Sequence, residues 1–424
     1  MYLALVAGVR LLLVIHHVLT DVVDLDHAGD IPFYFQMVQL SDRGLYPFLH
    51  FWTEYPPVFP LLITGLYRGL AFIGLNTLQG FTVAFQAVFF GIEAANMVLL
   101  FHLVRRVHGE RPARFATAIY AGCPALVFFS SGWFDPLAVL FSLGAIFALS
   151  TRRTTAAGIL VGLGILTKIY PGVLLVAVPV ALDWRETRRA VAATLGTLAA
   201  ILVPLLLVRG DLLLASFASM VTRPPWETVQ ALLIGNYAWG TVPDPEQRFT
   251  AASAFVSSGT PFLLTVVPAT VLAFAVLGSW LALKNENERN VYAVATLAVT
   301  AFLLANKGFS PQFTTWIIPM ILLVWPNRTG LVYVALFSLH FLAYDRVVFP
   351  AMHAYFETGQ ITFEAMTPLV WISVLSRTLL LAAIALHLLR KIGSPAAGLT
   401  SVFGGNMRMI ALSNQKSGVT TRAA

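Results

Sequence analysis

Long apolar runs are the feature that most constrains this chain, because they recur along almost its whole length. A helix that spans a bilayer needs about 20 mainly apolar residues, and runs of that kind follow one another from residue 2 to residue 389. Hydrophobic residues make up 58% of the 424 residues and charged residues only 11%, whereas soluble domains carry about 25% charged residues. The sequence therefore predicts an all-α, multi-pass integral membrane protein.

We expect about twelve membrane segments. The run 155–182 is too long for one helix and is interrupted by Pro171 and Gly172, so it is predicted to be a re-entrant pair of short helices. Three prolines and Arg68 weaken Val58–Gly74 as a span, and it is expected to be an interfacial or re-entrant helix on the outer face. The other predicted spans are 2–20, 81–104, 113–131, 134–150, 190–208, 260–283, 290–306, 312–326, 329–345 and 367–389.

The charge distribution predicts the orientation of these segments. With both termini in the cytoplasm, 17 of the 27 Lys and Arg residues lie on the cytoplasmic side and 14 of the 20 acidic residues lie outside, as the positive-inside rule requires. The basic residues occupy short connectors, a pattern typical of membrane topology rather than of a nucleic-acid-binding face. The first apolar run lacks a small-residue cleavage site, so we interpret it as a retained helix. The short loops favour a prokaryotic plasma membrane.

The chain is expected to form one membrane domain, at 1–392. Two larger external elements are predicted, a loop at 21–80 and a second loop at 209–259. The segment 393–424 is rich in Gly and Ser, which is typical of a disordered tail, here on the cytoplasmic side.

Acidic residues gather in the first external loop, where six of the 20 lie between Asp21 and Pro57. Carboxylates held against a bilayer are costly, so proton abstraction from a lipid-borne substrate is a candidate use. Asp30 is the first candidate for this general base, although it could also cap a helix that begins at Ile31–Pro32. Asp24 and Asp26 form a D-x-D string that is a weak candidate for a divalent-cation site.

The segment from Asp30 onward resembles the first external loop of GT-C membrane glycosyltransferases, in particular glycosyltransferase family 87 and its polyprenyl-phosphate-dependent mannosyltransferase relatives. In that pattern an Asp is followed four residues later by a Tyr, here Asp30 and Tyr34. A Gly-x-Tyr-Pro turn then begins at Gly44, and a Tyr-Pro-Pro string begins at Tyr55. The resemblance implies that Asp30 is the general base and that Tyr34, Glu54 and Tyr55 contact substrate.

A second motif, N-K-G-F-S-P-Q-F at 306–313, is similar to a K-x-x-S-x-Q-[YF] signature of the same enzymes. The resemblance implies that Lys307 meets the phosphate of the donor as a point charge. It also implies that Ser310 and Gln312 contact the substrate, with Gln312 on a sugar hydroxyl. The alternative is that Lys307 is a snorkelling lysine at a helix end.

Two further candidates lie near the re-entrant pair. Lys168 occupies a G-x-x-x-x-[TS]-K-x-x-P string similar to one in the family, and it would stabilise the departing phosphate or else pair with a nearby acid. Asp135 follows a short turn where relatives often carry G-Q-x-D, and it could bind sugar or cap the next helix.

Arg223, in the second loop, could shape the acceptor site, since long loops are often functional. Glu93 and Arg377 could be a buried pair or could face a cavity.

The resemblance implies an inverting transfer of a hexose, with mannose the expected sugar, from a polyprenyl or dolichyl phosphate to a hydroxyl of a glycan or glycolipid. The partners would be that donor, that acceptor and membrane lipids, without nucleic acid. No cofactor is expected to be required, although a divalent cation could take part. The main alternative is a lipid-linked sugar flippase or secondary transporter, which should show symmetric broken helices and paired charges near the midplane. A non-catalytic membrane subunit would leave the acidic loop unexplained.

Overall fold

The computed structural model describes residues 2–21, 29–238, 243–254, 273–274, 276–278, 280–282 and 289–393. This part of the chain is helical and contains no β-strand. The first half holds α1 (Tyr2–Asp21), α2 (Ile31–Gln39), α3 (Val58–Phe72), α4 (Leu78–His108), α5 (Glu110–Gly122), α6 (Pro124–Gly132), α7 (Asp135–Ser150), α8 (Thr154–Ile165), a 3-10 helix at Tyr170–Ala177 and α9 (Val178–Ala181). The second half holds α10 (Trp184–Thr222), α11 (Val229–Leu233), α13 (Arg289–Ala305), α14 (Thr314–Val324), α15 (Arg328–Ala343), α16 (Phe349–Phe356) and α17 (Phe363–Gly393).

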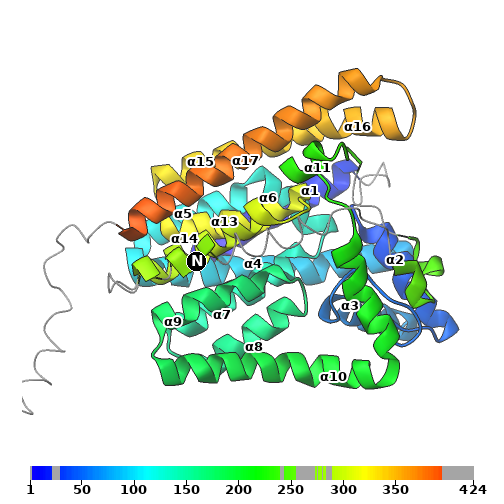
Figure 1. Cartoon of the computed structure of the whole chain (residues 1–424), viewed down its shortest axis with the longest axis horizontal. Coiled ribbons are helices and arrows are strands. Elements are labelled where there is room, and N and C mark those ends of the chain that lie inside the picture. Colours follow the sequence, from blue (N-terminus) through cyan, green and yellow to red (C-terminus); the bar gives the residue numbers. More distant parts are fainter. Residues whose placement is uncertain are drawn as a thin grey trace, which may run out of the picture.

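The helices form an elongated bundle in which α8 and α10 lie along one side and α15 and α17 along the opposite side (Figure 1). Between them a large apolar core is formed by α4, α5, α7, α13 and α14. A second apolar cluster joins α2 and α3 to the first half of α4 and is rich in phenylalanine. We call the end of the bundle that carries α2 and α3 the site end.

Small residues bring α8 against α10. A Cβ atom placed on Gly158 would lie 2.1 Å from the carbonyl oxygen of Ala190, and one on Gly162 would lie 2.7 Å from the Thr197 side chain. Glycines four residues apart let two helix backbones approach closely, which is a common mode of helix packing in membranes. The Thr194 hydroxyl also donates to the Gly158 carbonyl at 2.9 Å.

Among the residues that the structure describes, four helical stretches are long and apolar enough to cross a bilayer, and the bent pair α5–α6 makes a fifth if it is counted as one span. The four are Leu78–His108, Trp184–Thr222, Arg328–Phe356 and Phe363–Gly393. The chain is therefore an integral membrane protein. Seven further apolar helices of the described residues are shorter, with 10 to 17 residues. The total of twelve segments and the interfacial position of α3 stay predictions.

The structure changes several predicted boundaries. The predicted span 113–131 is bent by 59° between α5 and α6, because Pro124 cannot continue the helical hydrogen bonding of α5. The predicted break near Lys168 is confirmed, since α8 ends at Ile165 and a 3-10 helix follows from Tyr170. Helix α10 continues to Thr222, beyond the predicted end at 208, with non-helical backbone at Arg209.

The second predicted loop therefore begins as a helix. This helix changes direction at Arg209 and then runs across the site end, beside α3 (Figure 1). The helical stretch that starts with α15 likewise runs to Phe356, past its predicted end at 345, through a π-helical turn at Tyr344–Val348. Most of the predicted span 260–283 and the tail after Gly393 lie outside the described residues.

Candidate functional site

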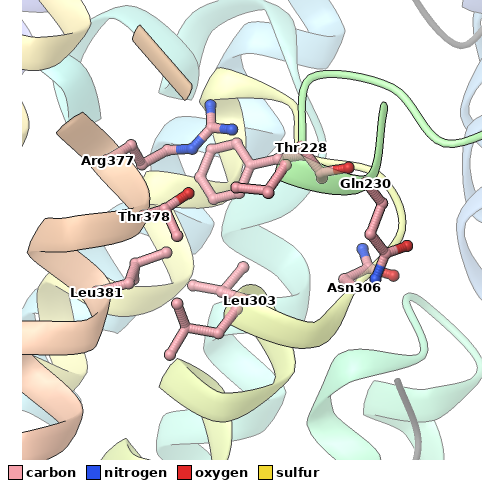
Figure 2. Close-up of a pocket in the computed structure, with 10 residues that line it drawn as sticks. Thr228, Gln230, Leu303, Asn306, Arg377, Thr378 and Leu381 are labelled. Atoms are coloured by element: carbon pink, nitrogen blue, oxygen red, sulfur yellow. The ribbon is translucent and has the colours of Figure 1, made fainter. Parts of the chain in front are cut away.

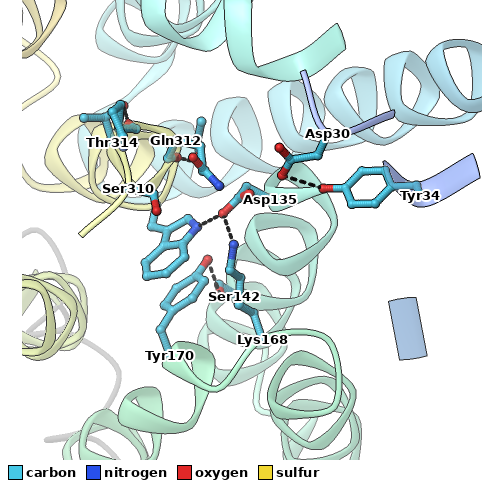
Figure 3. Close-up of polar contacts among 12 residues, drawn as sticks. Asp30, Tyr34, Asp135, Ser142, Lys168, Tyr170, Ser310, Gln312 and Thr314 are labelled. Carbon is cyan, nitrogen blue, oxygen red and sulfur yellow. Dashed lines mark hydrogen bonds and ion pairs between the residues drawn. The ribbon is translucent and has the colours of Figure 1, made fainter. Parts of the chain in front are cut away.

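The centre of the candidate site is an ion pair between Asp135 and Lys168. The Lys168 ammonium donates to Asp135 Oδ1 at 2.7 Å, and the indole N–H of Trp316 donates to the same oxygen at 2.6 Å (Figure 3). Asp135 is fully buried in the first turn of α7, whereas the Lys168 side chain keeps 16% of its exposure. The Lys168 side chain is thus paired with a nearby acid, as one of the two predicted alternatives expected. The other carboxylate oxygen, Asp135 Oδ2, is buried and has no hydrogen-bond partner among the described residues.

Aromatic rings surround the Lys168 ammonium. Its Nζ atom lies 4.5 Å from the ring centroid of Phe134, 4.9 Å from Phe313 and 5.0 Å from Trp316. Trp316 is itself stacked between Phe313 and Tyr170, with ring centroids 4.0 and 4.1 Å apart. A cation over an aromatic face is stabilised by the ring quadrupole, so these rings hold the ammonium in one place.

Asp30 lies beside this pair, at the position that precedes α2. The Tyr34 hydroxyl donates to Asp30 Oδ2 at 3.1 Å, and the Asp30 amide donates to the Gly132 carbonyl at 3.3 Å. Asp30 occupies the N-cap position of α2, but its side chain makes no capping hydrogen bond. The carboxylate is directed toward the region of Asp135 and Lys168 instead (Figure 3).

The environment of Asp30 favours its protonated form. Burial raises the pKa of the Asp30 carboxyl to about 6, and the negative charges of Asp135 and Glu54 act in the same direction. The hydrogen bond from Tyr34 and the charge of Lys168 lower this pKa and only partly offset the effect of burial. A carboxyl group with a pKa near the working pH can both accept and release a proton, as a general base must.

The segment 306–313 enters the site from the end of α13. The Lys307 ammonium donates to the carbonyl oxygens of Val221 and Arg223, at the C-terminal end of α10. Burial lowers the pKa of Lys307 to about 8, and the charge of Arg223 contributes. In Figure 3 the Gln312 amide is directed toward Asp135. Ser310 accepts a hydrogen bond from the Trp226 indole at 3.3 Å.

Gly308 is required for the contact between this segment and Trp226. The Trp226 amide donates to the Lys307 carbonyl and the Phe309 amide donates to the Trp226 carbonyl, both at 3.1 Å. A Cβ atom on Gly308 would lie 2.3 Å from the Trp226 ring. Gly308→Ala should therefore displace Trp226 and destabilise the protein by about 1–3 kcal/mol, the usual cost of overpacking.

Unfolding of the purified protein by detergent titration would measure this change. Gly359→Ala is a poor control because Gly359 has a positive φ of 63°. Gly65→Ala is a better one, since its Cβ would meet nothing within 4 Å. A Gly308→Ala protein as stable as Gly65→Ala would contradict the predicted clash.

A second charged group lies next to Asp30 and contains Glu54, Arg223 and Arg248. Glu54 and Arg248 form a buried ion pair. The charges of Glu54, Arg223 and Arg248 all act on the Tyr55 hydroxyl, as does that of Asp30. The Tyr55 ring contacts the Tyr34 ring edge-on, with centroids 6.0 Å apart.

Glu93 and Arg377 do not form a pair. Glu93 lies 3.9 Å from the Arg10 guanidinium and accepts a hydrogen bond from Tyr120 at 2.9 Å. Arg377 donates to the Glu227 backbone carbonyl and lines a pocket between α11, α13 and α17 (Figure 2). Glu93 is therefore the buried ion-pair partner of Arg10, and Arg377 faces a cavity.

The structure brings together most of the residues that the sequence singled out. Asp30, Tyr34, Asp135 and Lys168 form one group, with Gln312 directed toward it. Glu54, Tyr55 and Arg223 form the adjoining one. Lys307 lies at the end of α10, beside Arg223. Asp24 and Asp26 lie outside the described residues, so the cation site stays a prediction.

No sequence motif indicated a role for Arg248. This residue stands in a polar segment without a motif, and only its complete burial distinguishes it from the surface arginines.

Comparison with known proteins adds one match. A family model described as Glycosyltransferase family 87 matches residues 52–311, which is more than half of the chain. The matched range contains Glu54, Asp135, Lys168, Arg223 and Lys307. Gln312 directly follows its last residue, whereas Asp30 precedes its first residue by 22 positions. No match was found among curated proteins.

Proposed function

Because this chain belongs to glycosyltransferase family 87, we propose that it is a membrane enzyme that transfers a hexose from a polyprenyl or dolichyl phosphate. The expected sugar is mannose, and the acceptor is a hydroxyl of a glycan or glycolipid on the extracytoplasmic side. The observation that carries the proposal is the Asp30 carboxyl, whose pKa burial raises to about 6. This carboxyl lies beside the Lys168 ammonium, which donates to Asp135. Trp316 donates to the same oxygen of Asp135 and so fixes its position.

The reaction needs one carboxylate. Asp30 takes the proton of the acceptor hydroxyl while the oxygen attacks the anomeric carbon from the side opposite the phosphate. The bond between that carbon and the phosphate oxygen breaks, and the phosphate leaves with the electron pair. The configuration is inverted without a covalent glycosyl-enzyme. A phosphate leaving group needs no general acid, in contrast to the paired carboxylates of glycosidases.

Cationic side chains offset the charge that grows on the leaving phosphate. Lys168 is positioned for this role by Asp135 and the surrounding rings. Lys307 lies in the segment 306–313, where its ammonium donates to the Arg223 carbonyl. Asp135, Ser310 and Gln312 are proposed to bind sugar hydroxyls, for which carboxylate and amide groups supply hydrogen-bond partners. Tyr34 holds the Asp30 carboxylate in one orientation.

A transfer assay tests the proposal. The purified protein in nanodiscs would receive radiolabelled polyprenyl-phosphate mannose together with crude membrane glycolipids. We expect label to move into the glycolipid fraction with inverted configuration. If no label moves with mannose, glucose or arabinose donors, the proposal is wrong and transport of a lipid-linked sugar becomes the function to measure.

The pH dependence of this transfer follows from two pKa values. Asp30 acts only when ionised, so kcat/KM should fall as the pH is lowered through about 6. Lys307 binds phosphate only when protonated, so kcat/KM should also fall as the pH rises through about 8. The profile should therefore be bell-shaped. Initial rates between pH 5 and pH 9 would show it.

A substitution of Lys307 provides the control for the fall of kcat/KM at alkaline pH. Lys307→Arg keeps a positive charge across this range, because an arginine guanidinium does not deprotonate in proteins. This variant should lose the fall near pH 8 and keep the fall near pH 6. An alkaline limb that persists in Lys307→Arg would assign it to another group.

A further inference from the structure

Two arginines at the site end carry more hydrogen-bond donors than the described residues satisfy. Arg248 is fully buried and is paired with Glu54. Its guanidinium lies 5.0 Å from the ring centroids of both Phe33 and Trp52, and its Nε atom donates to the Pro243 carbonyl at 2.6 Å. Its Nη2 atom is buried and has no partner among the described residues.

Arg223 lies next to this pair. It follows the last residue of α10, and its guanidinium lies 5.3 Å from the Trp226 ring centroid. Its charge interacts with Glu54, Tyr55 and Arg248. Its Nε and Nη2 atoms are also buried, and within the part of the chain that the structure describes neither has a partner.

The charges around Glu54 do not balance. The carboxylates here are Glu54 and, next to it, Asp30. They face the two guanidinium groups and the Lys307 ammonium, which is bonded to the backbone carbonyl of Arg223. Burying an uncompensated charge is costly, and buried N–H donors without an acceptor are rare in folded proteins. An anion would remove both costs. Lys168 differs, since Asp135 already balances its charge.

The chemistry of the donors indicates a phosphate. Guanidinium groups present parallel N–H donors that match the oxygens of a phosphate, and the unpartnered atoms belong to two guanidinium groups near Glu54. The charges of both arginines and of Asp30 act on Tyr55. A phosphate held by the arginines would therefore lie close to the base and to the anomeric carbon.

We propose that Arg223 and Arg248 bind the phosphodiester of the lipid-linked sugar donor, and that Glu54 is a positioning residue that orients Arg248. This inference rests on the proposed donor class. The site joins two distant parts of the chain, because Trp52 and Glu54 contact the segment that carries Arg248. The donor phosphate would be held where the first and second loops meet.

Equilibrium binding, without sugar transfer, tests this site. Radiolabelled polyprenyl phosphate and the matching polyprenol would be bound to the immobilised full chain in detergent. We expect the wild type to bind the phosphate form at least about tenfold more tightly than the alcohol. Arg223→Gln and Arg248→Gln should each lower affinity for the phosphate form by about tenfold or more, the scale of a lost charged hydrogen bond, and leave affinity for the alcohol unchanged.

Arg346→Gln is the matched control, because the Arg346 side chain is 82% exposed and pairs only with its neighbour Asp345 among the described residues. Arg223→Gln is the safer variant, since the Nε and Nη2 atoms of Arg223 have no partner among the described residues that the substitution could remove. Thermal melting would confirm that each variant is folded. Glu54→Gln should weaken binding less than Arg248→Gln, and Arg248→Lys should not restore it.

Unchanged phosphate preference in a folded Arg223→Gln protein would overturn the site. Displacement of polyprenyl phosphate by phosphatidylinositol at equal affinity would also overturn it as a donor site, because the arginines would then bind acceptor phospholipid. These outcomes differ from failure of the proposed function, which would appear as selective phosphate binding by the wild type without any transfer of sugar.

Discussion

Asp30→Asn is expected to lower kcat by at least about a hundredfold, the scale of general-base removal. Asparagine has nearly the same shape and still accepts a hydrogen bond from Tyr34, but it cannot take a proton from the acceptor hydroxyl. The folded protein should therefore be as stable as the wild type. The measurement is the initial rate of sugar transfer at saturating donor, together with the melting temperature of both proteins.

Asp42→Asn is the matched control for this variant. Asp42 belongs to the same part of the chain, but its side chain is 42% exposed and pairs with Arg68 at 3.2 Å. It should keep the wild-type rate. If Asp30→Asn also keeps that rate, Asp30 is not the base, and Asp24, Asp26 and Asp135 become the residues to replace.

Asp135→Ala is expected to destabilise the protein by about 3–5 kcal/mol, the cost of removing one partner from a buried ion pair. The change leaves the Lys168 ammonium and the Trp316 indole without their common acceptor. The double variant Asp135→Ala/Lys168→Met should recover much of this loss, because no unpaired charge then remains in the apolar site. Unfolding in mixed micelles of increasing SDS content would measure both proteins.

An exposed pair provides the control. Asp211 pairs with Arg209 at 2.8 Å, and its side chain is 51% exposed. Asp211→Asn should leave the unfolding midpoint unchanged within error, because many exposed ion pairs contribute nothing measurable. If Asp135→Ala also unfolds at the wild-type midpoint, the Asp135–Lys168 pair does not stabilise the bundle, and its role is confined to substrate.

Local sequence signals predicted the parts of the fold that depend on neighbouring residues. Pro171 interrupts an apolar run, and the helix does end before it, at Ile165. Pro32 and the acid before it predicted the start of α2. The bend at Pro124 was missed because the apolar run continues through it, and hydrophobicity alone does not register a change of helix direction.

The candidate site was predicted residue by residue but not as an arrangement. Motif resemblance singled out Asp30, Asp135 and Lys168 separately. The predicted alternative that Lys168 pairs with a nearby acid did not identify Asp135 as that acid. Nothing in the sequence indicated that the indole of Trp316, 181 residues from Asp135, donates to the same oxygen. Arg248 carried no motif at all. Its importance follows only from its burial beside Glu54, 194 residues away.

The sequence by itself determined that this chain is a helical membrane protein and that six of its 20 acidic residues lie between Asp21 and Pro57. Each apolar run must satisfy its backbone hydrogen bonds without water in the lipid, and an α-helix does so within a single segment. Tertiary structure alone decided which charges meet. Ion-pair partners on different helices depend on how those helices pack, so the balance at Asp135 and Lys168, and the excess of positive charge around Glu54, appear only when the bundle is assembled.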